Sequence, residues 1–316
     1  MECIAYTSNG WFVIIYCGKI KVVYRVSFYL LGGENMGIEK EYNKEIEQIA
    51  KDRNFRRINH FVMDHTYSLC TNNEKYMKEI DNTNKASYMV RQEDDLNVKP
   101  DGKTTNIIVS KKRTYEAAKA YNGKKIAVLN FANNHSIGGA PWSAGAQEES
   151  LCRISTLYPC LEKFKKEFYQ YHKDLYMNGK MDELGNDDLI YLPNIMVFKT
   201  DESVPKLMED KDCYYVDVIT SAAPDLAVKF YDWNEYRILM YNRLKKIIQV
   251  AKKENVDIFI LGAYGCGAFH NPPEIIASLF KELLNEYHFD TVEFAVYCYN
   301  DDKFSNYNVF KNILEN

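Results

Sequence analysis

Short apolar runs alternate with stretches of helical periodicity in the part of the chain that follows Gly102. Five runs rich in valine and isoleucine predict strands, at residues 106–110, 125–130, 214–220, 257–261 and 292–297. Apolar residues at a helical spacing predict helices between and after them, at residues 115–121, 146–157, 236–253, 273–287 and 304–314. Strands that are apolar on both faces need helices on both sides of the sheet. The alternation therefore predicts a layered α/β fold with a mostly parallel sheet.

The segment that precedes this alternation is polar and predicts helix. Between residues 39 and 53, the apolar positions Ile46, Ile49 and Ala50 recur at a helical spacing. No stretch rich in proline, glycine and serine separates this segment from the rest of the chain. We therefore expect it to pack on the α/β core and not to form an independent domain.

An apolar stretch near the start of the chain, residues 11–31, could be mistaken for a membrane anchor. It carries Lys19, Lys21 and Arg25 in its middle, and a charge at the centre of a spanning helix costs about 2.5 to 3.5 kcal/mol. No cleavage site made of small residues follows it, so a secretory signal fits poorly. Its β-branched and aromatic content favours strands, or else a segment translated upstream of a second start at Met36. Both alternatives stay open.

Composition and charge narrow the classes of partner. The formal net charge is −4, which gives no basic face for nucleic acid or membrane. The eight cysteines include no C-x-x-C pair, and the six histidines form no H-E-x-x-H motif. We therefore expect reduced thiols in a cytosolic protein and no metal site. The lysine-rich run 111–115, "KKRTY", is predicted to be a solvated helix face.

Two loops follow predicted strands and carry unusual residues. In parallel α/β sheets, ligands bind at the carboxyl ends of the strands. The loop after Leu129 reads "NFANNHSIGGAPWSAGAQEE", and the loop after Leu261 reads "GAYGCGAFHNPP". Because parallel strands end at the same edge of a sheet, these loops are the first candidates for a shared binding site.

The second loop is suited to an anion. Gly262, Gly265 and Gly267 lie between a strand and a helix, where glycines let backbone N–H groups face a phosphate or diphosphate. The alternative is a tight turn without a ligand. A dinucleotide-binding fingerprint fails, because the position of its third glycine is occupied by His270.

The first loop ends in two adjacent carboxylates, Glu148 and Glu149. Neighbouring helix positions point about 100° apart, so the pair should not clamp one metal ion. Burial or mutual repulsion would raise the pKa of one of them and give the two glutamates different functions. The alternative is that they only cap a helix. Asparagines in the same loop suit sugar hydroxyls, so the two loops together predict a pocket for a nucleoside diphosphate sugar, with a glycosidic bond as the target.

These motifs carry a resemblance to a known family. "LNFAN" followed by "GGA" and "QEES", together with "DVITSAAP" and "LGAYGCGAFHNPPE", resembles the microbial poly(ADP-ribose) glycohydrolases, which have a macrodomain fold and a GGG-x(6–8)-QEE motif. The resemblance extends over roughly residues 104–300. It implies a macrodomain-like three-layer α/β/α catalytic domain at 104–316 with a mixed, mostly parallel sheet. An N-terminal helical extension would occupy residues 36–103, and residues 1–35 would be a segment without an assigned role.

The resemblance also implies a function for each matching residue. Glu149 would be the general acid that protonates the leaving ribose hydroxyl and then the base that activates water, and Glu148 would hold hydroxyls of the terminal ribose. Gln147 would support the loop. The residues implied to bind the substrate are Asn133, Gly138, Gly139, Gln147, Gly265, Cys266, Gly267 and Phe269, with the loop from Gly265 to Gly267 holding the diphosphate.

The chain departs from the family motif at its third glycine. Either Ala140 or Ile137 takes that place, depending on where the spacer is aligned. A β-carbon there can block a close backbone approach or forbid a positive φ. Trp142 in the spacer either stacks on a sugar or base, or packs within the protein.

The resulting prediction is a cytosolic, monomeric hydrolase that releases ADP-ribose from poly(ADP-ribose), without a metal or other cofactor. Its partners would be poly(ADP-ribose) or another ADP-ribosylated substrate, and neither a membrane nor a specific nucleic-acid sequence. Two alternatives stay open. One is a module that only binds ADP-ribose, and the other is a hydrolase of a different ADP-ribosyl linkage. A module that only binds has no need of the acid Glu149, which argues against the first.

Overall fold

The structure of the chain, a computed structural model, describes residues 3–6, 12–16, 19–23, 35–102, 104–228, 232–298 and 305–315. Its main sheet has seven strands, in the order β4-β7-β8-β6-β9-β10-β5. Their bounds are β4 (Tyr88–Val90), β5 (Asn106–Ser110), β6 (Ile126–Ala132), β7 (Leu189–Val197), β8 (Tyr214–Ala222), β9 (Ile258–Leu261) and β10 (Thr291–Ala295). The five strands from β8 to β5 are parallel, while β7 and β4 add two antiparallel pairs at one edge. The predicted mixed, mostly parallel sheet is confirmed.

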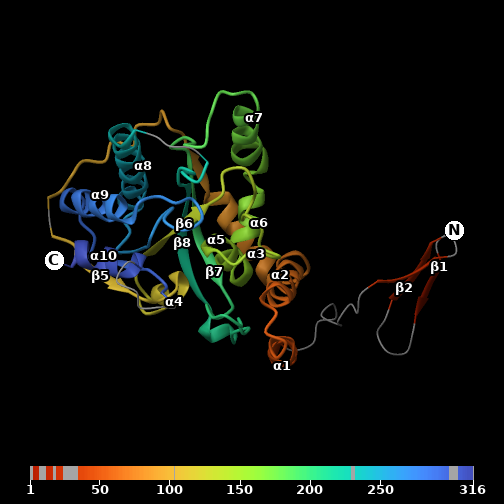
Figure 1. The fold of residues 1–316 in the computed structure, drawn as a ribbon. Helices are drawn as coiled ribbons and strands as arrows, with labels where there is room; N and C mark the ends of the chain where they lie inside the picture. Colours follow the sequence, from red (N-terminus) through yellow and green to blue (C-terminus); the bar gives the residue numbers. More distant parts are fainter. Residues whose placement is uncertain are drawn as a thin grey trace.

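Helices cover both faces of this sheet (Figure 1). One layer holds α8 (Trp233–Lys253), α9 (Pro273–Glu286) and α10 (Asn306–Leu314). The other holds α4 (Thr114–Lys119), α5 (Gln147–Ile154) and α6 (Leu157–Glu162). Residues of β6 alternate between the two cores. Ala127 and Leu129 face the first layer, while Ile126 and Val128 face the second. This alternation is what a strand buried on both faces requires, and it gives the predicted three-layer α/β/α architecture.

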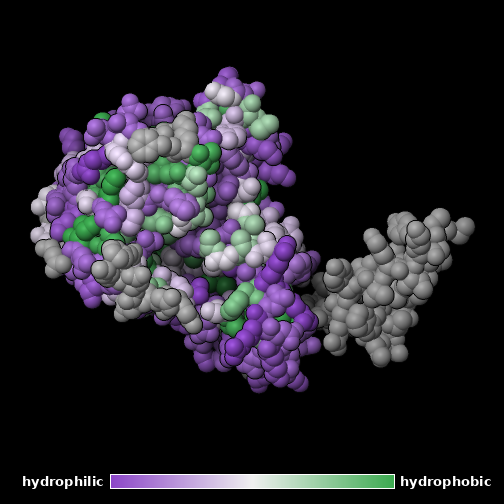
Figure 2. Space-filling view, in the orientation of Figure 1, coloured by the Kyte–Doolittle hydropathy of each residue, from purple (hydrophilic) through white to green (hydrophobic). Residues whose placement is uncertain are grey.

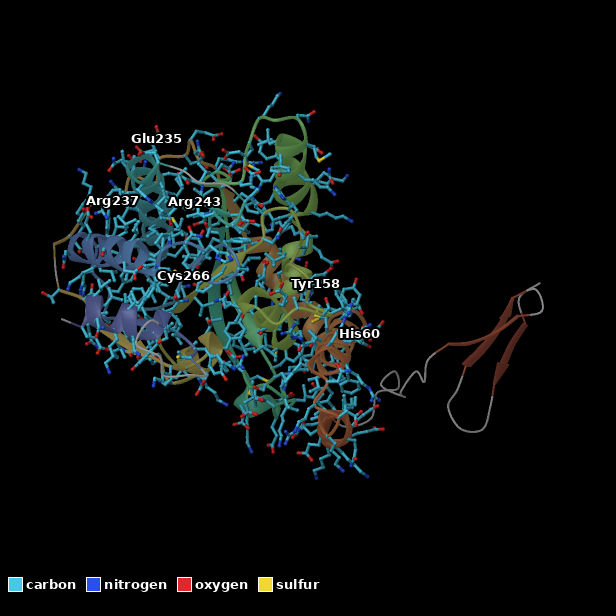
Figure 3. All side chains as sticks on the ribbon, viewed as in Figure 1. His60, Tyr158, Glu235, Arg237, Arg243 and Cys266 are labelled. Atoms are coloured by element: carbon cyan, nitrogen blue, oxygen red, sulfur yellow. The ribbon has the colours of Figure 1, made fainter. Side chains whose placement is uncertain are left out.

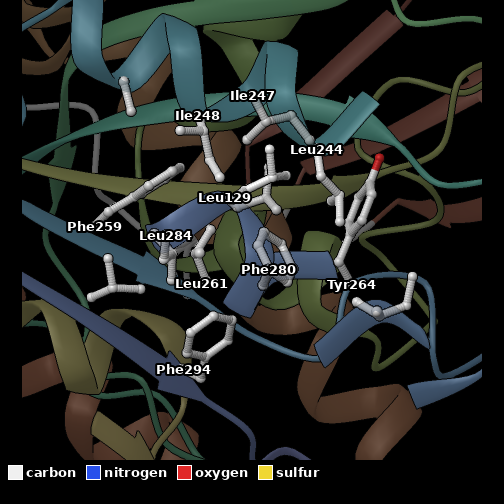
Figure 4. Close-up of a cluster of buried hydrophobic side chains, with 14 of the residues drawn as sticks. Leu129, Leu244, Ile247, Ile248, Phe259, Leu261, Tyr264, Phe280, Leu284 and Phe294 are labelled. Carbon is white, nitrogen blue, oxygen red and sulfur yellow. The ribbon is translucent and has the colours of Figure 1, made fainter. Parts of the chain in front are cut away.

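Large side chains fill the first core (Figure 4). Leu129, Phe259 and Leu261 of the sheet lie against Leu244 and Ile247 of α8, all almost fully buried. Phe280 of α9 stacks edge-on against Phe294 of β10, with 5.2 Å between the ring centroids. Burying such side chains contributes roughly 1.5 to 3 kcal/mol each. The core therefore fixes the strand ends from which the two candidate loops leave.

The N-terminal segment folds as three helices, α1 (Asn35–Ala50), α2 (Phe55–Asn72) and α3 (Glu74–Ala86). The predicted helix at residues 39–53 corresponds to α1. A third hydrophobic cluster joins these helices to the end of β7 through Met196 and Phe198. The short strand β4 follows α3 and pairs with β7. The boundary at residue 103 between an extension and a catalytic domain stays a prediction.

A separate antiparallel sheet is formed by β1 (Cys3–Tyr6), β2 (Phe12–Tyr16) and β3 (Lys19–Val23). Two of these strands lie in the apolar stretch 11–31, which agrees with its β-branched content. The rest of that stretch lies outside the described residues. Within the part of the chain that the structure describes, no helix is both long and apolar enough to cross a membrane.

All five predicted strands of the main sheet are present, with ends that shift by at most two residues, but two strands of this sheet were missed. In β7, Pro193 and a register shift between Leu192 and Ile195 interrupt the alternation, and Asn194 adopts a left-handed φ of 54°. β4 has only three residues. Also missed were α2, α3, α6, the π-helical segment Lys165–Gln170 and α7 (Tyr171–Met177).

The single predicted helix at residues 146–157 is wrong at its end. The helix α5 ends at Ile154, because Ser155 is extended and forms a bridge with Val197 of β7, and α6 begins only at Leu157.

Candidate functional site

The two candidate loops meet at one edge of the sheet, as predicted. β6 is parallel to both β8 and β9, so their carboxyl ends lie side by side. A cavity of about 500 Å³ opens there, and Figure 2 shows a hollow near the centre of this face of the molecule. Eight of the ten predicted site residues line the cavity: Asn133, Gly139, Gln147, Glu148, Glu149, Gly265, Gly267 and Phe269.

Gln147 joins the first turn of α5 to the sheet. Its side-chain NH2 donates to the carbonyl of Leu129 at 2.8 Å and to Thr114 Oγ1 at 3.1 Å. Its Oε1 accepts the backbone N–H of Phe131 at 2.9 Å. These bonds fix the start of the helix against β6, and the supporting role that the resemblance implies for Gln147 stays a prediction.

Glu148 is buried and bonded to the end of β6. Its Oε2 accepts the backbone N–H of Asn133 at 2.8 Å, and its Oε1 accepts the side-chain NH2 of Asn130 at 3.1 Å. Burial raises the pKa of Glu148 to about 8, against the effect of these two hydrogen bonds, and the charge of Glu149 raises it further. The sequence predicts that one glutamate of the pair has a raised pKa, and the structure identifies Glu148.

This raised pKa predicts a fall in stability with rising pH. In the unfolded chain Glu148 should lose its proton near the ordinary value of 4.5, whereas in the folded chain it keeps the proton up to about pH 8. Between these values the folded state binds the additional proton, so the free energy of unfolding decreases as the pH rises. We expect the melting temperature to fall more between about pH 5 and pH 9 in wild type than in Glu148→Gln. Equal falls in the two proteins would contradict the assignment.

Glu149 lies beside the glycine pair. Its Oε1 accepts the backbone N–H of Ala140 at 3.2 Å. A β-carbon on Gly139 would lie 2.4 Å from Glu149 Oε1 and 3.4 Å from Glu148 Oε2. Although neighbouring helix positions point in different directions, both carboxyl groups therefore approach Gly139, so the two glutamates face the same part of the cavity.

The missing third glycine leaves the shape of the loop intact. Gly138 and Gly139 have left-handed φ values of 63° and 66°, whereas neither Ile137 nor Ala140 does. Gly138 is buried behind the cavity, where a β-carbon would lie 2.9 Å from Cys152 Sγ. Ile137 packs against the second core, and Ala140 is exposed. The backbone thus needs glycine only at the two positions that have it.

Trp142 packs within the protein. Its Nε1 donates to Asp64 Oδ1 at 2.7 Å, and its ring meets those of Tyr158 and Tyr67 with centroids 5.4 and 6.1 Å apart. Of the two alternatives left open by the sequence, the structure supports packing.

The loop after β9 is held by a residue that sequence reasoning missed. The side-chain NH2 of Asn271 donates to the carbonyls of Pro224, Gly265 and Phe269, and its Oδ1 accepts from the hydroxyl of Tyr236 at 2.7 Å. Gly265 has φ 73°, and a β-carbon there would lie 2.5 Å from Asn271 Nδ2. The only sequence signal was an asparagine directly before two prolines at a helix start.

Of the three residues predicted to bind the diphosphate, two line the cavity and one does not. Cys266, labelled in Figure 3, does not line the cavity, and its backbone N–H already donates to the carbonyl of Ala263 at 3.0 Å. Its Sγ lies 3.5 Å from the carbonyl of Tyr264. Gly265 and Gly267 line the cavity. The substrate-binding role of Cys266 stays a prediction.

The run "KKRTY" contributes to the cavity, so the prediction of a solvated helix face is wrong for part of it. Arg113 and Thr114 line the cavity, and Thr114 is buried. The Arg113 guanidinium lies over the ring of Tyr297, 4.3 Å from its centroid. Asp201, also a lining residue, accepts the backbone N–H of Tyr115 at 2.9 Å, and burial raises the pKa of its carboxyl group. Among the described residues, no group of three or more histidine, cysteine and acidic side chains is arranged to hold a metal ion.

Comparison with known proteins extends these observations. Residues 56–200 match the family model of the microbial-type PARG catalytic domain, where PARG stands for poly(ADP-ribose) glycohydrolase. The search of curated proteins gave no match. The structure of the glycohydrolase from Thermomonospora curvata bound to the inhibitor ADP-HPD is similar, with a TM-score of 0.70 and 28% identity over 80% of this chain and 98% of that chain. The enzyme from Deinococcus radiodurans in complex with ADP-ribose has a TM-score of 0.64 and 26% identity, over 75% of this chain and 96% of that chain.

The matched residues include β6, the loop after it and the QEE helix, which carry the first part of the predicted resemblance. The similar structures extend over the rest of the α/β fold. Motif, family model and fold agree: residues 56–200 match the microbial-type PARG catalytic domain, and the α/β fold is similar to that of microbial poly(ADP-ribose) glycohydrolases.

Proposed function

We propose that this chain hydrolyses ribose–ribose O-glycosidic bonds in poly(ADP-ribose) and releases ADP-ribose. The main supporting observation is that Glu148 and Glu149 both approach Gly139 in a cavity that the glycine-rich loop after β9 also lines. This arrangement brings two carboxyl groups and an anion-binding turn within reach of one nucleoside diphosphate sugar. The family match and the similar glycohydrolase structures support the same reaction.

Glu149 is the proposed general acid and base. Both oxygens of Glu148 accept hydrogen bonds from β6 and the loop that follows it, whereas Glu149 is the more exposed of the two, at 8% against 3%. Glu149 protonates the oxygen of the leaving ribose as the glycosidic bond breaks and positive charge develops on the terminal ribose. It then removes a proton from the water that attacks that ribose. This cycle needs no change in the oxidation state of any group.

Glu148 and Asn133 hold the terminal ribose in this proposal. Because its pKa is about 8, Glu148 is mostly protonated at neutral pH and can donate a hydrogen bond to a sugar oxygen. Asn133 Oδ1 accepts the backbone N–H groups of His135 and Ser136, at 2.8 and 2.9 Å, which fixes the side chain at the edge of the cavity. Its NH2 group is then the part that can reach the ribose.

The diphosphate lies against the loop from Gly265 to Gly267, and Phe269 packs on the adjoining ribose. Asn271 supports this arrangement by bonding three carbonyl groups around the loop. A rigid loop is favourable here, because backbone donors that are already positioned lose little entropy when an anion binds.

Location and assembly are part of the same proposal. We propose a cytosolic monomer, and the six free cysteines in the described part of the chain support the cytosolic location. Reduced thiols are typical of cytosolic proteins.

The decisive test is release of free ADP-ribose from purified poly(ADP-ribose) by the full chain, with a mono-ADP-ribosylated protein as a second substrate. We expect ADP-ribose to appear from the polymer at a rate proportional to the amount of protein. Binding of ADP-ribose without release from the polymer would contradict the proposal. Release only from the mono-ADP-ribosylated protein would assign a different linkage.

A further inference from the structure

Helix α2 contacts the turn that joins the glycine pair to the two glutamates, residues 140–146. Asn59 donates from its side chain to the carbonyls of Ser143 and Ala144, at 3.3 and 3.1 Å. Asp64, one turn further along α2, accepts the indole N–H of Trp142 at 2.7 Å. Figure 3 labels His60 on α2 and Tyr158 on α6, and the Tyr158 ring meets that of Trp142 in this turn, with 5.4 Å between the centroids.

The same turn is held from α5 by a buried arginine. Arg153 Nη1 donates to the carbonyls of Pro141 and Ala144, at 2.9 and 2.7 Å. The backbone carbonyl of Arg153 in turn accepts the hydroxyl of Thr66 on α2. The turn is therefore fixed between α5, which carries the glutamates, and α2, which belongs to the N-terminal segment.

A short series of bonds connects this turn to Glu149. The backbone N–H groups of Ser143 and Ala144 both donate to the carbonyl of Ala140, at 3.0 and 2.9 Å. The N–H of Ala140 donates to Glu149 Oε1 at 3.2 Å. Any shift of the turn consequently moves the backbone N–H of Ala140, which contacts the proposed acid. Small displacements of catalytic groups lower the reaction rate strongly.

We infer that Asp64 is a positioning residue for the reaction, which acts on Glu149 through Trp142 and the turn at residues 140–146. The part of this inference that concerns kcat rests on the proposed function. A carboxylate that accepts an N–H forms a stronger bond than a neutral acceptor at the same exposure does, and the hydrogen bond from Trp142 to Asp64 is the contact of α2 with the turn that has a charged acceptor. The N-terminal segment is thus part of the active-site scaffold.

Asp64 is also the best place to test the inference without unfolding the protein. Its side chain is 58% exposed, and its second oxygen lies 2.8 Å from His60 Nδ1, itself 61% exposed. Removing it creates no cavity in a core. Asp52 gives a matched control, because its carboxylate has the same 58% exposure and pairs with Arg57 at 2.6 Å beside the start of α2.

The experiment compares Asp64→Ala, Asp64→Asn, His60→Ala and Asp52→Ala with wild type in full-length protein. We expect kcat for ADP-ribose release to fall about tenfold in Asp64→Ala, the size expected for one lost hydrogen bond to a charged group. The KM and the ADP-ribose affinity should stay within about twofold. Asp64→Asn keeps an acceptor oxygen and should retain more than half of the wild-type kcat. His60→Ala and Asp52→Ala should match wild type.

An Asp64→Ala protein with wild-type kcat, or an equal loss of kcat in Asp52→Ala, would overturn the inference. A second readout separates it from the proposed function. Hydrogen exchange of the backbone at residues 138–149 should be faster in Asp64→Ala than in Asp52→Ala, whatever the reaction is. If wild type releases no ADP-ribose from the polymer, the proposed function fails, while faster exchange would still support the tie to the turn. Equal exchange in the two variants would overturn the inference as well.

Discussion

Replacing Glu149 with glutamine should abolish the release of ADP-ribose from poly(ADP-ribose) and leave the affinity for ADP-ribose within a few-fold of wild type. The amide has nearly the shape of the carboxyl group, and its oxygen can still accept the N–H of Ala140. It cannot supply the proton that the leaving ribose oxygen needs. General acid and base catalysis contributes about 10²- to 10⁴-fold, so we expect kcat to fall by roughly 10³-fold.

Single-turnover release measured beside calorimetric binding of ADP-ribose separates the chemical step from affinity. Glu148→Gln is the comparison, because Glu148 is the glutamate with the raised pKa and could itself be taken for the acid. We expect Glu148→Gln to bind ADP-ribose more weakly, because in wild type both carboxyl oxygens of Glu148 accept hydrogen bonds, from Asn130 and from the backbone of Asn133. Full turnover by Glu149→Gln, together with tight binding and no turnover by Glu148→Gln, would exchange the two roles.

Much of the fold could be predicted because its determinants are local. The five parallel strands are continuous apolar runs, and the helices after them show helical spacing, so neither depends on distant residues. β7 could not be predicted in this way. It holds a proline and a left-handed Asn194, whose backbone N–H donates to Asp217 Oδ1 on the neighbouring strand at 2.9 Å. A partner 23 residues away compensates for the irregularity, and the sequence of β7 alone does not contain that information.

The same distinction applies to the site. Glycines and glutamates in loops that directly follow predicted strands indicated which loops form the cavity, because ligands of parallel α/β sheets bind at the carboxyl ends of the strands. Other supporting side chains were not predictable, since Asn271, Arg113 and Asp64 are polar residues with no distinctive sequence pattern, and only the fold places their partners beside them. The sequence also left open which glutamate has the raised pKa. That choice depends on burial at the end of β6, a property of the packed structure.

Gly139→Ala should reduce kcat about 10²-fold, although both glutamates remain in place. Gly139 has a left-handed φ of 66°, and a β-carbon there would lie 2.4 Å from Glu149 Oε1 and 3.0 Å from its Cδ. An L-residue in this conformation costs roughly 1 to 2 kcal/mol, which should lower the melting temperature by several degrees. The clash adds a second effect, because either the loop or the proposed acid has to move by a large part of an ångström. A displacement of about 1 Å at a catalytic group can cost 10²-fold in rate.

Gly145→Ala provides the control within the same loop. Gly145 also lines the cavity, but a β-carbon there meets no protein atom within 4 Å and its φ is not left-handed, so Gly145→Ala lacks the contact with Glu149 and its kcat should stay near that of wild type. The kinetics should therefore separate two glycines that lie six residues apart. If Gly139→Ala keeps full kcat while its melting temperature falls, the loop can move away from Glu149 without cost, and the contact of Ala140 with the carboxylate has no part in catalysis. If Gly139→Ala loses rate and Gly145→Ala does not, the close approach of the glycine backbone to Glu149 is itself a requirement of the reaction.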